Sequence, residues 1–324
     1  MTTHSIPPTF ELQRDERVRP GLLRVAAAWA EVLRTQVERP EAEHEAAVHT
    51  ARLALKRLRA MLRLLRPSLD AAIASRESER LRRAAAQLAP SRDAAVALNT
   101  LTDLAARAGR RAPGDAQCVA SVRSALASAM HDPARSGAGV SRALLDAADA
   151  ARTSVEALSV TPWRQKGWRL LAAGVHASHL RARRRLRRAR RARSALADDD
   201  TFHAWRAAVK SLLYQLQLVR AAVPPPRRAL LDGLDRLQEQ LGREHDLEML
   251  AAAIEQHRLQ LGPPEAVRLV LRLAERRRRA LRKAAIERGE QLLGVPSTKF
   301  VARLHRRWLR WRRRFRRPAT ARSS

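Results

Sequence analysis

The chain has 324 residues, enough for one large domain or two small ones with a sizeable hydrophobic core. Apolar residues make up 45% of the sequence, and 64 Lys and Arg residues against 32 Asp and Glu residues give a formal net charge of +32. A charge of this size predicts a polyanionic partner. The single cysteine, Cys118, excludes an intramolecular disulfide and a cysteine-ligated zinc site, and it fits a reducing cytoplasm.

The N-terminal residues MTTHSIPPTFELQRDER are polar and acidic, whereas a signal peptide needs a basic start and then an apolar segment. No apolar run approaches the ~18 residues that suggest a membrane-spanning helix. We therefore expect a soluble cytoplasmic protein with no transmembrane segment, and we expect disorder at both ends, over residues 1–9 and 318–324.

Helical spacing of Ala, Leu and Arg runs along nearly the whole chain, while strand-like alternation is absent. The predicted fold class is all-α. Proline and glycine interrupt the pattern and predict about nine or ten helices, several of them long. The predicted breaks fall at Pro40, Pro67, 109–114, 132–139, Pro162, 224–226 and 262–264.

Two short motifs each occur twice. VHTARLALKRLRAML at 48–62 aligns with FHAWRAAVKSLLYQL at 202–216, and QLAPSRD at 87–93 aligns with QLGREHD at 240–246. The offsets are 154 and 153 residues, so both motifs recur with nearly one shift. This repetition predicts two homologous halves, residues 10–160 and 161–317, each built as an antiparallel four-helix bundle.

The first copy of the longer motif predicts a helix with a core face and a separate cationic stripe. At ~100° per residue, the basic side chains of the stripe fall within a sector of about 100°. At ~1.5 Å per residue the stripe is about 25 Å long, so a linear polyanion along it could meet a cation at every turn. Its residues are His49, Arg52, Lys56, Arg59, Arg63 and Arg66.

The second copy keeps His203, Arg206 and Lys210 but has Leu213 and Gln217 where the first has arginines. The first half is therefore expected to be the stronger anion site. Asp93 and Asp246, which occupy matching positions in the shorter motif, could be catalytic carboxylates, but we expect them to pair with stripe cations and orient them.

The pattern V-H-x-x-R-x-x-x-K-R-L-R at 48–59, its second copy from His203, and the two shorter elements resemble the CHAD domain, the "conserved histidine α-helical domain". The opening FELQRDERVRPGLLRVAAAWAEVL at 10–33 also resembles the start of that family. SHLRARRRLRRA at 178–189 resembles its basic fifth helix, with His179 where a tyrosine is expected. The likeness covers about residues 10–317 and includes no CYTH signature.

This resemblance implies two pseudo-symmetric four-helix bundles whose basic helices line a central groove or pore. It also implies non-catalytic binding of inorganic polyphosphate, location at polyphosphate granules, and no cofactor. The residues that the resemblance marks as contacts are His49, Arg52, Lys56, Arg57, Arg59, Arg63, Arg181, Arg184, Arg188, His203, Arg206 and Lys210.

Two other functions stay open. The net charge alone would suit a general nucleic-acid binder, although aromatic residues, which stack on bases, make up only 3% of the chain. His245-Asp246, with His203 and His257 nearby in sequence, would suit a metal-dependent phosphohydrolase of the helical HD type. The first repeat has Arg92 in place of His245, which argues against this second alternative.

The segment FVARLHRRWLRWRRRF at 300–315 predicts an amphipathic helix. Its apolar side carries Phe300, Leu304, Trp308, Trp311 and Phe315, and arginines surround the rest. We expect this side to dock on the bundle, and contact with an anionic membrane surface is the alternative.

Overall fold

The computed structural model describes residues 8–88, 90–110, 112–130, 137–191, 199–220, 223 and 227–313. Eleven α-helices and four short 3-10 helices make up the regular structure of these residues, and no strand occurs among them. The all-α class predicted from sequence is confirmed. Within the same residues, no helix is both long enough and apolar enough to cross a membrane.

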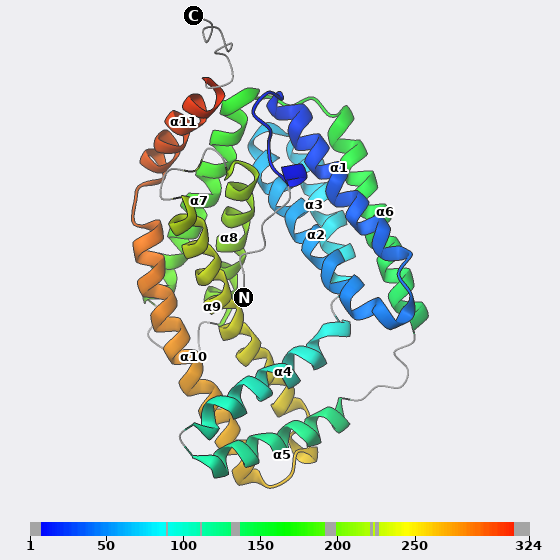
Figure 1. The fold of residues 1–324 in the computed structure, drawn as a ribbon, viewed down its shortest axis with the longest axis vertical. Coiled ribbons are helices and arrows are strands. Elements are labelled where there is room, and N and C mark those ends of the chain that lie inside the picture. Colours follow the sequence, from blue (N-terminus) through cyan, green and yellow to red (C-terminus); the bar gives the residue numbers. More distant parts are fainter. Residues whose placement is uncertain are drawn as a thin grey trace, which may run out of the picture.

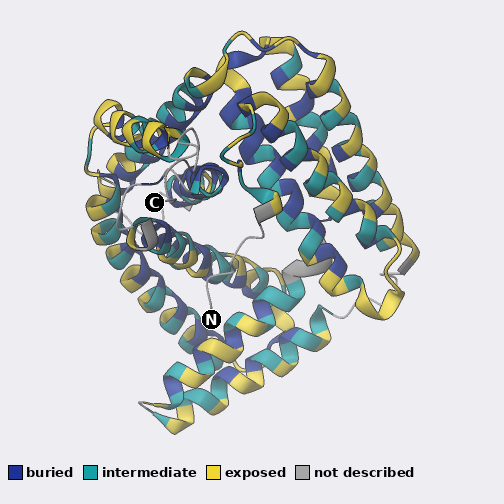
Figure 2. Ribbon diagram, turned by 45° about the horizontal axis from the view of Figure 1, so that its top comes forward, coloured by how far each residue is buried: buried dark blue, intermediate teal, exposed yellow. Residues whose placement is uncertain are grey.

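The first group of helices packs as a four-helix bundle (Figure 1). It consists of α1 (Val18–Val37), α2 (His44–Leu65), α3 (Ala71–Gln87) and α6 (Gly137–Val160). Short 3-10 helices, η2 (Glu41–Glu43) and η3 (Arg66–Ser68), flank α2, and η1 (Pro8–Phe10) packs on α1. The apolar residues of α2 recur every three or four positions, which turns one continuous face toward the core (Figure 2).

The second group is a bundle of α7 (Gly167–Arg191), α8 (Asp199–Leu218), α9 (Arg227–Gln256) and α10 (Pro264–Leu293). The last helix, α11 (Ser297–Arg313), lies on α7. The predicted boundary between residues 160 and 161 coincides with the end of α6. Helix α2 contacts both α7 and α8, so the basic helices of the two halves meet at the interface between the bundles.

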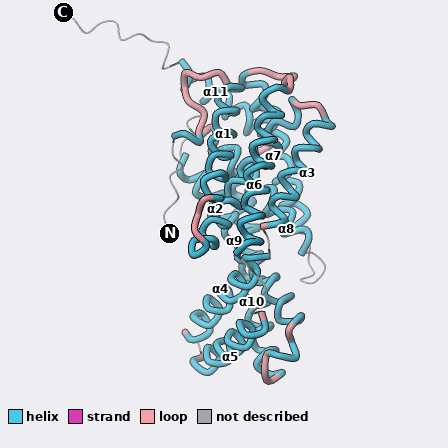
Figure 3. Tube along the Cα trace, turned by 90° about the vertical axis from the view of Figure 1, so that its right-hand side faces the viewer, coloured by secondary structure: helices cyan, strands magenta, loops and turns pink. Residues whose placement is uncertain are grey.

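A helical hairpin of α4 (Pro90–Gly109) and α5 (Pro113–Ala129) belongs to the first half in sequence but packs on the second bundle. It lies against the distal ends of α9 and α10, with the short helix η5 (Arg258–Gln260) beside α5 (Figures 1 and 3). Leu101 and Leu126 of the hairpin share a separate hydrophobic core with Leu250 and Val270. The hairpin therefore ties the halves together, which two self-contained bundles would not do.

The helix boundaries follow the predicted breaks, with three additions: between α3 and α4, between α7 and α8, and between α10 and α11. Helices α3 and α4 are separate, and the break lies at Leu88 and Pro90. Proline at the start of a helix is favourable, because its missing N–H would have no intrahelical partner there. In the second half, α9 runs without interruption through the matching QLGREHD motif.

Close approach of α7 to α2 depends on Gly174. A Cβ atom at this position would lie 2.1 Å from the carbonyl oxygen of Leu64. Glycine has no side chain, so it lets the two backbones touch. This contact fixes the basic helix α7 beside the C-terminal end of the cationic stripe.

Candidate functional site

The stripe predicted on α2 lies at the edge of the first bundle. Leu55, Leu58 and Leu62 of α2 are buried in the core. His49 and Arg66 are exposed, while Arg52, Lys56, Arg59 and Arg63 are half-buried. The helix therefore separates its apolar and cationic faces as the sequence predicts. The middle of the stripe is more buried than its two ends.

Helices α2 and α8 cross in antiparallel orientation, and polar contacts mark the crossing. Arg63 Nε donates to Ser211 Oγ at 2.9 Å, Arg57 Nη1 donates to Gln217 Oε1 at 3.0 Å, and Gln215 Nε2 donates to the Ala60 carbonyl at 2.9 Å. Positions that lack arginine in the second repeat thus bind the arginines of the first. The departures from the basic pattern at Ser211 and Gln217 have a structural reason.

Arg57 lies outside the cationic stripe and has an aromatic environment. Its guanidinium lies between the rings of Trp29 and Tyr214, at 4.9 Å and 4.7 Å from their centroids. Burial lowers the pKa of Arg57, and Tyr214 opposes this effect. A guanidinium held between two rings stabilises the packing of α1 and α8 on α2, and the predicted contact of Arg57 with a ligand stays a prediction.

Five arginines from three helices and η3 gather around the C-terminal end of the stripe, and we call them the arginine cluster. Four of them line a cavity of about 250 Å³ together with Leu62, Ser75, Ser78 and Glu79, and the fifth, on α7, acts electrostatically on Arg63. The cluster consists of Arg59, Arg63, Arg66, Arg82 and Arg181.

The cluster is not neutralised by the residues that line its cavity. Glu79 is the one carboxylate of that lining, and it pairs with Arg82 at 2.6 Å and with Arg83 at 2.8 Å. These two arginines lower the pKa of Glu79 to about 2. Arg59, Arg63 and Arg66 therefore add positive charge to the cavity beyond what Glu79 offsets.

The pKa of Arg63 reflects its burial beside other arginines. Burial, together with repulsion from Arg59 and Arg181, lowers its pKa to about 10. The Ser211 hydroxyl accepts its hydrogen bond but carries no charge. An anion in the cavity would relieve the repulsion and bind through charge-assisted hydrogen bonds.

The basic helix α7 packs on α2, and Arg181 of α7 lowers the pKa of Arg63 by repulsion. Arg184 and Arg188 follow Arg181 at three and seven residues, so the three side chains share one face of α7, and all are exposed. The structure thus places Arg181 with the first-half stripe, while Arg184 and Arg188 extend the same face along α7.

In both halves, the arginine of the longer motif reaches the shorter motif. Arg52 Nη1 donates to the Leu88 carbonyl at 2.6 Å, and a Cβ atom at Gly242 would lie 3.6 Å from Arg206 Nη2. In each half, the two motifs therefore lie side by side. Lys210 is half-buried on the same helix as Arg206.

His203 is exposed at the start of α8, and its ring lies beside His245 with 4.8 Å between centroids. Burial of the imidazole lowers the pKa of His203, as do His245 and Arg206, while Glu248 opposes them. His245 itself contacts Glu248, with 3.1 Å between Nδ1 and Oε2. Among the described residues, no group of three or more His, Cys, Asp or Glu side chains could hold a metal ion.

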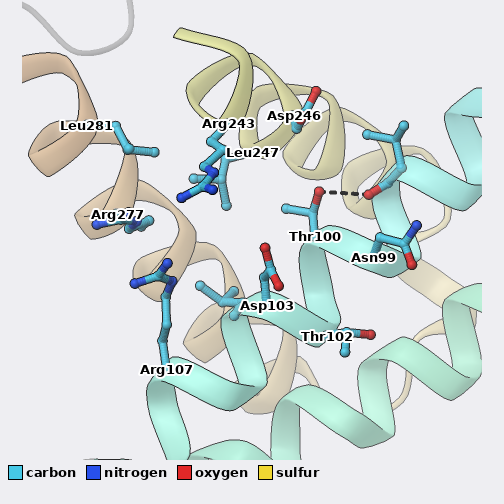
Figure 4. Close-up of a pocket in the computed structure, with 12 residues that line it drawn as sticks. Asn99, Thr100, Thr102, Asp103, Arg107, Arg243, Asp246, Leu247, Arg277 and Leu281 are labelled. Atoms are coloured by element: carbon cyan, nitrogen blue, oxygen red, sulfur yellow. Dashed lines mark hydrogen bonds between the residues drawn. The ribbon is translucent and has the colours of Figure 1, made fainter. Parts of the chain in front are cut away.

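Asp246 lines a cavity of about 350 Å³ between α4, α9 and α10 (Figure 4). Asp103 and three arginines, Arg107, Arg243 and Arg277, line the same cavity. The pKa of Arg277 is lowered by burial and by the other two arginines. The orienting role of Asp246 stays a prediction, and the side chain of Asp93 lies outside the described residues.

His179 of α7 is buried in the contact with α11. Its Nδ1 lies 2.9 Å from Ser297 Oγ, and its ring stacks on Phe300 at 4.2 Å. Burial lowers its pKa to about 4. Leu304 and Trp308 of α11 are also buried, so this helix docks on the bundle as expected, while Phe315 lies outside the described residues.

Sequence reasoning missed Arg82, Ser75 and Ser78, which α3 contributes to the cavity. No motif marks them, because α3 reads as an ordinary surface helix with alternating charges. Only the packing of α3 against α2 brings these side chains to the stripe.

Comparison with known proteins agrees with this all-helical fold. The family model of the CHAD domain matches residues 22–255, so the chain belongs to the CHAD domain family. The crystal structure of the CHAD domain from the plant Ricinus communis is 18% identical with a TM-score of 0.57, covering 92% of this chain and 94% of that one. That likeness supports the fold alone. Comparison with curated proteins gave no match.

Proposed function

We propose that the protein binds inorganic polyphosphate without cleaving it, and that the arginine cluster is the strongest part of the binding site. The observation that carries this proposal is the excess positive charge around the cavity of Arg59, Arg63 and Arg66. Membership of the CHAD family, which is associated with polyphosphate, supports the choice of ligand.

A linear phosphate polymer suits the geometry of the cationic residues. The stripe continues from the cluster along α2 through Lys56 and Arg52 toward His49, and Arg184 and Arg188 extend it along α7. Each guanidinium presents a planar fork of donors that fits phosphate oxygens. By analogy with nucleic acids, each neutralised phosphate should add roughly 0.7–0.9 to the slope of log affinity against log salt.

The chemistry of the cluster favours binding over cleavage. Guanidinium groups stay protonated and cannot act as general bases. Glu79 is held in its ionised form by two arginines that already donate hydrogen bonds to it. A site of this kind holds an anion, and association with cytoplasmic polyphosphate granules belongs to the same proposal.

General binding of nucleic acid is the second candidate, favoured by the net charge of +32. Phosphate contacts carry no sequence information, so RNA and DNA would engage the same arginines in vitro. The HD-type phosphohydrolase is the less favoured alternative, since its one structural support is the contact between His203 and His245.

Competition between polyanions tests the proposal. Long-chain polyphosphate, single-stranded RNA and duplex DNA, matched for total phosphate, would compete for the protein at about 150 mM salt. We expect polyphosphate to win by at least about 100-fold, because its flexible chain follows the stripe more closely than a stiff duplex. Equal competition by all three would overturn the proposal in favour of nucleic-acid binding.

A further inference from the structure

Two adjoining cavities lie away from the arginine cluster, where α1, α7, α11 and the 161–166 connection meet. Their volumes are about 470 Å³ and 570 Å³. Gln165, Lys166 and Trp168 line both. Small-molecule sites typically occupy ~300–1,000 Å³ and combine aromatic walls with a few polar groups.

Aromatic rings form much of the first cavity. Three of the six tryptophans in the chain, Trp163, Trp168 and Trp308, line it together with Val18 and Pro20. Trp168 and Trp308 are adjacent, with 5.7 Å between ring centroids, and His305 stacks on Trp168 at 4.9 Å. This concentration of rings is high for a chain with 3% aromatic residues. Trp163 and Trp308 are buried, with Arg19 and Arg312 at 5.2 Å and 5.4 Å from their ring centroids, so the half-buried Trp168 offers most of the aromatic surface to a flat ring.

Every ionisable side chain along the described lining of the two cavities is basic. Arg19 donates to the carbonyls of Ser159 and Thr161, and Arg312 donates to those of Arg14 and Glu16. Carbonyl oxygens satisfy these donors without neutralising their charge. The exposed basic residues of the lining are Arg17, Arg19, Arg164, Lys166 and Arg169. Arg164 lies 3.6 Å from the Asp70 carboxylate, so the other four carry the charge that no carboxylate offsets in the lining. The site therefore selects an anion.

Gln165 adds a specific requirement. Its Oε1 atom is buried and has no hydrogen-bond partner among the described residues. A buried acceptor without a partner costs free energy, so a ligand that supplies an N–H donor would be favoured. A ligand that fits this site would therefore combine an apolar ring, an N–H donor and a negative charge in one molecule.

We infer that this pocket binds a nucleotide. The base lies against Trp168, beside the buried Trp163 and Trp308, with its amino group donating to Gln165 Oε1. The phosphate lies toward the exposed cations Arg17, Lys166 and Arg169. We call these residues the tryptophan pocket, and the inference stands apart from polyphosphate binding by the arginine cluster.

Adenosine 5′-monophosphate and ribose 5-phosphate form a matched pair of probes, because they share the phosphate and differ in the base. Titration calorimetry and quenching of tryptophan fluorescence would measure both. We expect one molecule of adenosine monophosphate per chain, bound at least about 10-fold more tightly than ribose 5-phosphate. Equal binding of the two probes, or no binding of either, would overturn the inference.

Substitutions test whether adenosine monophosphate binds in the tryptophan pocket. Gln165→Leu should lower the affinity for adenosine monophosphate by about 5-fold or more. Lys166→Glu should also lower this affinity, and it should leave the core intact because Lys166 is exposed. Gln291→Leu, an exposed glutamine on α10, is the matched control and should have no effect. Neither Gln165→Leu nor Gln291→Leu should change the affinity for long-chain polyphosphate.

Arg59→Ala/Arg63→Ala separates the two sites. If the nucleotide occupies the tryptophan pocket, this variant keeps its affinity for adenosine monophosphate while it loses polyphosphate binding. If Arg59→Ala/Arg63→Ala loses its affinity for adenosine monophosphate while Gln165→Leu keeps it, the nucleotide binds at the arginine cluster and the inference is contradicted.

Discussion

Arg63 of α2 and Ser211 of α8 meet across the interface between the two bundles, where Arg63 Nε donates to Ser211 Oγ at 2.9 Å. In the repeat alignment, Ser211 corresponds to Arg57, and Gln217 corresponds to Arg63. The second contact, from Arg57 to Gln217 at 3.0 Å, therefore mirrors the first. Arginine at all four positions would place like charges opposite one another in a partly buried interface.

The first prediction concerns this asymmetry. Ser211→Arg should lower the free energy of unfolding by about 2–4 kcal/mol, because it buries a second guanidinium beside Arg63. Urea unfolding measures the change. Ala207→Arg adds the same charge on the exposed side of α8 and should cost under about 0.5 kcal/mol.

Exchange of the pair is the decisive control. In Arg63→Ser/Ser211→Arg, the arginine and hydroxyl trade places, so most of the lost stability should return. If the exchanged variant is as unstable as Ser211→Arg alone, then steric crowding, and not repulsion between charges, explains the asymmetry.

The second prediction separates Arg57 from its neighbours on α2. Arg57→Ala should lower the free energy of unfolding by about 1–3 kcal/mol, because it removes two ring contacts and the hydrogen bond to Gln217. Its affinity for polyphosphate should change less than about 3-fold, since long-range charge is all that is lost. A large loss of affinity with unchanged stability would return Arg57 to the ligand-contacting residues.

The third prediction uses the buried His179, whose pKa of about 4 lies below the value of ~6.5 for an exposed histidine. The folded state therefore favours the neutral ring, and this contribution is fully present above pH ~6.5 and is lost as the pH falls toward 4. The loss should be on the order of 3 kcal/mol.

Comparison with His179→Tyr tests this contribution, because tyrosine keeps a ring against Phe300 but does not titrate in that range. Unfolding free energies at several pH values from 4 to 7 should diverge between the two proteins as the pH falls. Parallel curves would show that His179 does not titrate on unfolding.

The fourth prediction concerns the pH dependence of ligand binding. Burial, and then His245 and Arg206, lower the pKa of His203, and a bound polyanion would raise it, so the bound protein holds the proton more tightly. Affinity for polyphosphate should therefore increase as the pH falls from about 8 to 5. The increase should shrink in His49→Ala/His203→Ala, and an identical profile in this variant would remove both histidines from the site.

Periodicity alone was enough to predict the stripe, because Arg59 and Arg63 lie within its sector and do face the cavity beside α2. The same periodicity sets Arg57 about 80° from His49 and outside the stripe, which agrees with its burial between Trp29 and Tyr214. Family resemblance had grouped Arg57 with the ligand contacts. The contact of Arg57 with a ligand stays a prediction.

Tertiary packing accounts for what sequence could not predict. Arg82 joins the cluster only because α3 packs on α2, and the role of Ser211 depends on how α8 crosses α2. The hairpin of α4 and α5 crosses to the second half, where Leu101 and Leu126 complete a core with α9 and α10. An amphipathic face shows that a helix is covered, but it does not show which helix covers it.

Affinity for long-chain polyphosphate in Arg59→Ala/Arg63→Ala, measured by fluorescence anisotropy at about 150 mM salt, tests the central claim most directly. Arg272→Ala/Arg276→Ala on α10 is the matched control, because it removes two exposed arginines at the same spacing and changes the net charge equally. We predict a loss of about 100-fold or more in the first variant and under about 3-fold in the second. Equal losses in both would contradict the account, since the net charge of the protein would then suffice to explain binding.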